Sequence, residues 1–124
     1  MNRNNVLEKV VIIDFGSQFT QLIARKVREI GVYSEIININ KIGGLKKDNS
    51  IKGIILSGGP LTTTNKNSIN LDNYILNLNL PILGICYGHQ ILAKKFGGKV
   101  KISKTREFGH AIVSNKLNSP ITRN

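Results

Sequence analysis

A chain of 124 residues with 40% hydrophobic side chains is long enough for one domain with a buried core, and it is short for a complete enzyme. Its single cysteine excludes an intramolecular disulfide and fits a reducing compartment, and its apolar runs are too short for a membrane span or a signal sequence, so we expect a cytoplasmic protein. The net charge of +11 permits nucleic-acid binding, but the basic residues are scattered and only 6% of residues are aromatic, which favours a basic, solvated surface.

The first part of the chain predicts a strand, a helix and a second strand. Val10–Phe15 is a short apolar run bounded by a turn, which is typical of a strand buried on both faces. Ser17 is placed to cap a helix whose apolar residues recur at helical spacing up to Ile30, and Gly31 ends it. Residues 32–39 are a second β-rich run, and residues 41–50 are loop-like.

The same alternation continues through the rest of the chain. Gly53–Leu56 predicts a third buried strand that ends in a Ser57–Pro60 turn, and after a polar stretch Leu71–Leu78 predicts a helix. Ile82–Ile85 predicts a fourth strand, and the helix after it stops at Gly97. Strands alternating with helices indicate an α/β fold with a doubly wound, mostly parallel sheet, in one domain over residues 1–124. In such sheets the ligand crevice lies outside the carboxyl ends of the strands.

The only cysteine lies where the fourth strand meets the following helix, in Gly84-Ile85-Cys86-Tyr87-Gly88. This is the frame of a nucleophile elbow with sulfur in place of a serine hydroxyl: flanking glycines let the two backbones approach, and the side chain stands exposed. The N–H groups and the dipole of the following helix favour a thiolate there. Cys86 is therefore the candidate nucleophile. The alternative is that Cys86 is a small buried residue at the end of a strand. A motif as short as G-x-C-x-G, taken alone, favours this alternative.

A thiolate that attacks an acyl group also needs donors for the oxyanion. Negative charge develops on the carbonyl oxygen, and a good fixed donor stabilises it by about 3–4 kcal/mol. Gly58-Gly59 can present one backbone N–H because glycine permits close approach, and Tyr87, the residue after the nucleophile, can present the second. Without the elbow, Gly58-Gly59-Pro60 is an ordinary turn after a strand.

Four ordered segments together resemble one family. They are Asp14–Gln18 with the following Thr20–Arg25, then Ile54–Pro60, then Gly84–Gln90, then Arg106-Glu107-Phe108-Gly109. From about Val10 to Val113 the chain is similar to the amino-terminal part of the glutamine-hydrolysing GMP synthetases, whose amidotransferase domain is of the class I, or triad, type with a flavodoxin-like fold. The elbow alone indicates only the class, and Tyr87, the Asp14–Gln18 turn and the Arg106–Gly109 segment narrow the resemblance to this member.

The resemblance implies a chemistry and a set of site residues. Cys86 would attack the side-chain amide of glutamine to form a glutamyl thioester, which water hydrolyses to glutamate, while the ammonia serves a second active site. Gly59 and Tyr87 match the backbone oxyanion donors, and Gly58 and Gln90 match positions that contact glutamine. In this family the ammonia aminates adenylated xanthosine monophosphate, made with ATP and Mg²⁺ on a separate synthetase domain. None of the residues for this second reaction is present in the sequence, so we expect no metal or cofactor on this chain.

The chain differs from the family in its general base. The family's nucleophile is served by a His-x-Glu arrangement that lies beyond residue 124, so we expect a C-terminally incomplete domain. The two histidines present are His89, interpreted as structural or as a wall of the pocket, and His110, interpreted as packed or exposed.

Two alternative functions stay open. One is a catalytically incomplete module that binds glutamine weakly or is completed by a synthetase chain or C-terminal fragment supplying His-x-Glu. The other is a basic nucleic-acid-binding domain, supported by charge alone.

Overall fold

The computed structural model describes residues 7–59, 73–101, 111–114, 116–117 and 119–121. Within these residues one four-stranded sheet has the order β2-β1-β3-β4, and every neighbouring pair is parallel. The strands are β1 (Lys9–Asp14), β2 (Tyr33–Asn38), β3 (Ile51–Leu56) and β4 (Ile82–Gly84). The predicted α/β fold with a parallel sheet is therefore confirmed, and the four predicted strands are present with ends shifted by a residue or two.

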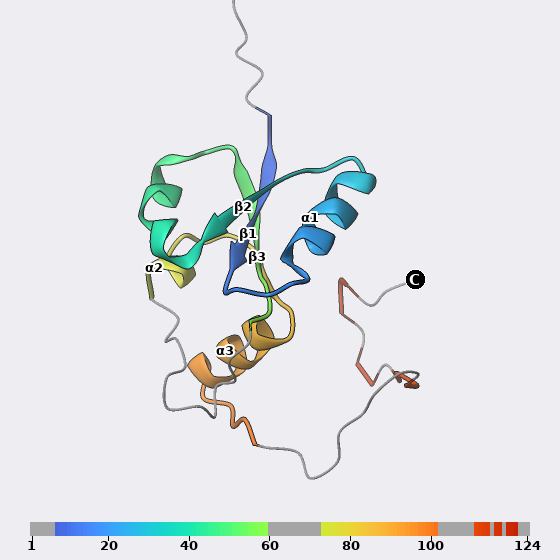
Figure 1. Cartoon of the computed structure of the whole chain (residues 1–124). Helices are drawn as coiled ribbons and strands as arrows, with labels where there is room; N and C mark the ends of the chain where they lie inside the picture. Colours follow the sequence, from blue (N-terminus) through green and yellow to red (C-terminus); the bar gives the residue numbers. More distant parts are fainter. Residues whose placement is uncertain (1–6, 60–72, 102–110, 115, 118, 122–124) are drawn as a thin grey trace, which may run out of the picture.

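Helical segments connect the strands and cover the sheet. α1 (Thr20–Glu29) lies between β1 and β2, and the 3-10 helix η1 (Ile39–Lys47) lies between β2 and β3. α2 (Asn73–Leu76) precedes β4, and α3 (Tyr87–Lys95) follows it. Figure 1 shows α1 on one side of the sheet and α2 on the opposite side, which is the doubly wound arrangement.

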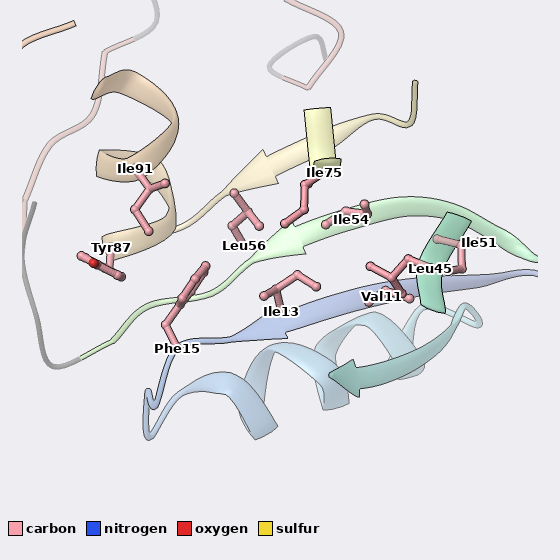
Figure 2. Packing of buried hydrophobic residues seen from close by; sticks show 10 residues of the cluster. All are labelled: Val11, Ile13, Phe15, Leu45, Ile51, Ile54, Leu56, Ile75, Tyr87 and Ile91. Atoms are coloured by element: carbon pink, nitrogen blue, oxygen red, sulfur yellow. The ribbon is translucent and has the colours of Figure 1, made fainter. Parts of the chain in front are cut away.

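The core follows from the alternation of side chains along β1. Val11 and Ile13 are fully buried and pack with Ile75 of α2 and with Leu45 of η1, as Figure 2 shows. Ile12 between them is also fully buried, and because successive side chains point to opposite faces it lies on the other side of the sheet. A strand that is buried on both faces has a continuous apolar run, which explains why β1 could be predicted from its sequence.

Two local predictions were wrong. Ser17 does not cap α1, because the helix begins at Thr20 with Phe19 at its N-cap position. The turn after β1 is instead closed by side chains: the Ser17 Oγ accepts the Phe19 N–H at 3.0 Å, and the Asp14 carboxylate accepts the Gly16 N–H at 2.8 Å. These bonds hold residues 15–19 in a tight loop ahead of the helix.

The tract at residues 41–50 is also not a loop, since most of it belongs to η1. The side chain of Asn38 accepts the Asn40 N–H at 2.9 Å and so starts this helix, and burial of Leu45 in the core anchors it. α2 lies inside the predicted helix Leu71–Leu78 but ends at Leu76, ahead of Asn79, which has a positive φ of 55°. The predicted start of that helix lies outside the described residues. No helix in the described part of the chain has the length and apolar character needed to cross a bilayer.

Candidate active site at the carboxyl ends of the strands

A pocket of about 410 Å³ opens at the carboxyl ends of β1, β3 and β4. The described residues that line it come from the loop Gly16–Phe19 after β1, from Gly58 and Gly59 after β3, and from Cys86 after β4. β1 and β3 are neighbours whose following connections lead to opposite edges of the sheet, so the pocket lies at the topological switch point where α/β sheets bind ligands. The three segments that the sequence predicted to converge do line one pocket.

Cys86 occupies the elbow between β4 and α3 in a backbone conformation that is rare for a residue with a side chain. Its φ is 53° and its ψ is −117°, and such conformations cost on the order of 1–3 kcal/mol unless the surroundings hold them. Two hydrogen bonds do so: the Ile85 N–H donates to the Leu56 carbonyl at 2.9 Å, and the Gly88 N–H donates to the Ser57 carbonyl at 3.1 Å. The thiol between these anchors is exposed, unlike a buried cysteine used for packing.

The flanking glycines of the elbow are required by close contact. A Cβ on Gly84 would lie 2.8 Å from the Gly88 carbonyl oxygen, and a Cβ on Gly88 would overlap the Leu56 carbonyl oxygen. The backbones of β4 and α3, and those of α3 and β3, therefore lie so close together that no side chain fits between them at these two positions. This is the physical reason for the glycines two residues before and after Cys86.

α3 begins directly after Cys86, so the thiol lies at the N-terminus of a nine-residue helix. The Gln90 N–H donates to the Cys86 carbonyl at 3.1 Å and joins the first turn of α3 to the elbow. Tyr87 is buried and meets the Phe15 ring edge to face, with ring centroids 5.6 Å apart (Figure 2). Tyr87 and Gln90 thus lie close to the nucleophile in the chain. Neither is among the described residues that line the pocket.

The Gly58-Gly59 turn is packed between the elbow and the loop after β1. A Cβ on Gly58 would lie 3.3 Å from the Cys86 Cβ and 3.3 Å from the Ser17 Oγ. A Cβ on Gly59 would lie 2.8 Å from the Phe15 carbonyl oxygen. Gly59 therefore has no room for a side chain, and a Cβ on Gly58 would fit only if its neighbours moved by a few tenths of an ångström, so the backbone of the turn lies close to Cys86.

Sequence reasoning missed a buried chain of hydroxyl groups beneath this turn. The Thr20 Oγ1 donates to the Asp14 Oδ1 at 2.9 Å, and the Ser57 Oγ lies 2.8 Å from the Thr20 Oγ1. Thr20 is 2% exposed and Ser57 is fully buried. A threonine and a serine at the ends of apolar segments look like ordinary turn residues in a sequence, and only the fold brings them together across 37 positions.

The remaining predicted residues are placed as follows. His89 lies on α3, its side chain is exposed, and it is not among the described residues that line the pocket. His110 and the Arg106–Gly109 segment lie outside the described residues. Among the described residues there is no group of three or more histidine, cysteine, aspartate or glutamate side chains that could hold a metal ion.

Residues 11–122 match the protein family described as "Glutamine amidotransferase class-I". The chain therefore belongs to the class I glutamine amidotransferases, a class whose substrate is glutamine. Its fold also matches the crystal structure of a Thermoplasma acidophilum protein described as a "putative gmp synthase subunit a protein", with a TM-score of 0.63 and 35% identity over 83% of this chain and 52% of that chain.

Within this class the chain is similar to the glutamine-hydrolyzing GMP synthases. It is 45% identical over 119 residues to that of Pelodictyon phaeoclathratiforme and 49% identical over 119 residues to that of Ruthia magnifica, which covers 93% and 95% of this chain. Each match covers 23% of the relative's length, so the chain spans about a quarter of these proteins. The resemblance inferred from the four sequence segments is confirmed.

Proposed function

We propose that this chain carries the nucleophile of a GMP synthase amidotransferase domain, and that it hydrolyses glutamine to supply ammonia for the amination of XMP to GMP. The observation that carries the proposal is the exposed Cys86 thiol, held at a positive φ on a glycine-flanked elbow beside the Gly58-Gly59 turn in one pocket. The pocket volume of about 410 Å³ is in the range of small-molecule sites.

In the proposed reaction the Cys86 thiolate attacks the side-chain carbonyl carbon of glutamine. The carbonyl oxygen becomes an oxyanion, which the N–H groups of Gly59 and Tyr87 stabilise. Collapse of this intermediate breaks the C–N bond, and ammonia leaves once its nitrogen has gained a proton. Water then attacks the thioester and releases glutamate and the thiolate. Gly58 and Gln90 contact the bound glutamine in this scheme.

The proton transfers need a general base, which in this family is the histidine of a His-x-Glu sequence. Neither of the two histidines in these 124 residues is part of such a sequence. We propose that a synthetase chain or a C-terminal segment contributes it. ATP and Mg²⁺ act on the synthetase domain in this scheme, and the chain itself binds neither. The setting is the cytoplasm, where purine nucleotides are made.

The alternative function as a nucleic-acid-binding domain finds less support at the pocket. The described residues that line it are all uncharged, so the positive charge of the chain lies elsewhere. An electrostatic site for a phosphate backbone needs lysine or arginine side chains gathered on one surface. Glutamine, which is small and has no net charge, fits a pocket lined by uncharged residues better than a polyanion does.

The test is the selective labelling of Cys86. The chain is incubated with a chloromethyl ketone analogue of glutamine, and the modified residue is identified by peptide mass mapping. We expect modification at Cys86, slowed by free glutamine and absent in Cys86→Ala. Labelling that is no faster than that of free cysteine and that glutamine does not slow would overturn the proposal.

A further inference from the structure

Ser57 is held in place from three directions. Its N–H donates to the Ile13 carbonyl of β1 at 3.1 Å, and its carbonyl accepts the Gly88 N–H of α3 at 3.1 Å. Its hydroxyl lies 2.8 Å from the Thr20 hydroxyl at the start of α1. One fully buried residue therefore ties together the end of β1, the first turn of α1 and the elbow, directly ahead of the Gly58-Gly59 turn.

The direction of the hydrogen bonds in this chain of hydroxyl groups can be assigned. A carboxylate only accepts hydrogen bonds, so the Thr20 hydroxyl uses its one proton on the Asp14 Oδ1, 2.9 Å away. The Ser57 hydroxyl must then be the donor to the Thr20 oxygen. The bonds run from Ser57 through Thr20 to Asp14, and the same carboxylate oxygen accepts the Gly16 N–H at 2.8 Å. Both buried hydroxyls are thereby satisfied.

We propose that Thr20 and Ser57 are positioning residues that aim the oxyanion donors at the carbonyl attacked by Cys86; this rests on the proposed function. The Gly58-Gly59 turn has no side chains of its own to fix it, and glycine backbones are the most permissive. The conformation of the turn is set by its neighbours, and the residue immediately before it is anchored by the Thr20 hydroxyl.

The carbonyl of Ser57 extends this role to the second donor. It accepts the N–H of Gly88, the residue after Tyr87, so Ser57 contacts the elbow next to that donor. The two proposed donors, Gly59 and Tyr87, lie on separate segments: Ser57 stands two residues before Gly59 and is hydrogen-bonded to Gly88, which follows Tyr87. If Ser57 loses its hydroxyl partner, the spacing of the two donors is free to drift. Misplacement of a reacting geometry by about 1 Å can cost on the order of 100-fold in rate.

The experiment compares two reagents on the Cys86 of the full 124-residue chain. Attack on a chloromethyl ketone analogue of glutamine passes through an oxyanion before sulfur displaces chloride, so its rate depends on the donors. Iodoacetamide alkylates the thiolate by direct displacement of iodide, without an oxyanion. The ratio of the two rate constants isolates the donor geometry from the exposure and ionisation of the thiol.

Thr20→Val and Ser57→Ala are expected to lower this ratio by about tenfold or more, since a single oxyanion donor is worth on the order of 100-fold. Thr20→Ser keeps the hydroxyl and should retain the wild-type ratio. Ser34→Ala is the matched control: Ser34 is another fully buried serine, but its hydroxyl donates to the Ala24 carbonyl at 3.0 Å, away from the pocket. It should leave the ratio unchanged even if it lowers stability.

The outcomes separate this proposal from the proposed function. A wild-type ratio equal to that of free cysteine overturns both. A wild-type preference for the glutamine analogue that survives in Thr20→Val and Ser57→Ala overturns the positioning role alone, as does a ratio in Ser34→Ala that falls as far. If Ser57→Ala loses its circular dichroism signal, Thr20→Val against Thr20→Ser decides the question.

Discussion

Lys9, the first residue of β1, joins the amino ends of three segments of the sheet. Its Nζ lies 2.5 Å from the Glu35 carboxylate of β2 and 3.0 Å from the Asp48 carboxylate just before β3. The Glu35 hydrogen bond first, and then the Asp48 bond, hold the pKa of Lys9 above its usual 10.5. The Ser50 hydroxyl, and after it Lys9, lower the pKa of Asp48 to about 2. These charges lie at the opposite end of the strands from Cys86, so they serve the fold and not the chemistry.

Asp48→Asn is expected to remove an acid-dependent part of the stability. The folded-state pKa of Asp48, about 2, is below its ordinary 3.8, so the unfolded chain binds more protons between these values. The stabilisation is fully present above about pH 4 and is lost as the pH falls toward 2. Urea unfolding from pH 7 to pH 2 should show wild type more stable than Asp48→Asn at neutral pH, with the difference vanishing in acid. The effect is modest because the Asp48 side chain is 36% exposed.

Glu8→Gln is the control for this measurement, since Glu8 is 73% exposed and its carboxylate lies 3.7 Å from Lys52. It should change the acid dependence very little. A difference between wild type and Asp48→Asn that is the same at pH 2 and pH 7 would contradict the assigned role of the carboxylate.

Among the elements, the elbow between β4 and α3 was the most predictable. Gly84 and Gly88 appear in the sequence at the two positions where a side chain would collide with backbone, so the motif itself encodes the close approach. β1 and β3 were also predictable, because burial of a strand requires a run of apolar residues that is visible within the strand's own sequence. η1 was missed because its helix depends on the burial of Leu45 against residues far along the chain. The Thr20–Ser57 bond was missed because it spans 37 positions, and no local pattern records it.

Gly88→Ala should damage the elbow as a structural element. The new Cβ would overlap the Leu56 carbonyl oxygen, so α3 must move away from β3, at a cost of about 1–3 kcal/mol or more in the free energy of unfolding. Urea unfolding measures this loss, and the reactivity of Cys86 toward the glutamine analogue should fall with it. Gly44→Ala in η1 is the matched control, because a Cβ there meets nothing within 4 Å. Equal stability of the two variants would show that α3 does not pack on β3 as described.

At the scale of the whole molecule, apolar side chains lie open on the described surface. Leu83 on the edge strand β4 is 43% exposed, Phe96 after α3 is 74% exposed, and Ile112 is 91% exposed. β4 is an edge of the described sheet, and an uncovered edge next to exposed apolar groups favours association with further chain or with a partner. The chain also spans only about a quarter of its curated relatives. The exposed edge and apolar groups agree with the proposal that a synthetase chain or a C-terminal segment completes the site.

A polypeptide of these 124 residues alone is accordingly expected to show negligible steady glutaminase activity. Its elbow provides the nucleophile, but His89 is exposed on α3 and the sequence has no His-x-Glu to take and return the proton. General acid–base catalysis is worth about 10²–10⁴-fold, so its loss alone brings turnover close to background even with the oxyanion donors in place. Glutamate release is measured for the polypeptide alone and mixed with a C-terminal segment that contains His-x-Glu, with Cys86→Ala as the control in each case. Activity should appear only in the mixture and should vanish in the control. Robust release by the polypeptide alone, abolished in Cys86→Ala, would instead require a base among His89, His110 and Glu107.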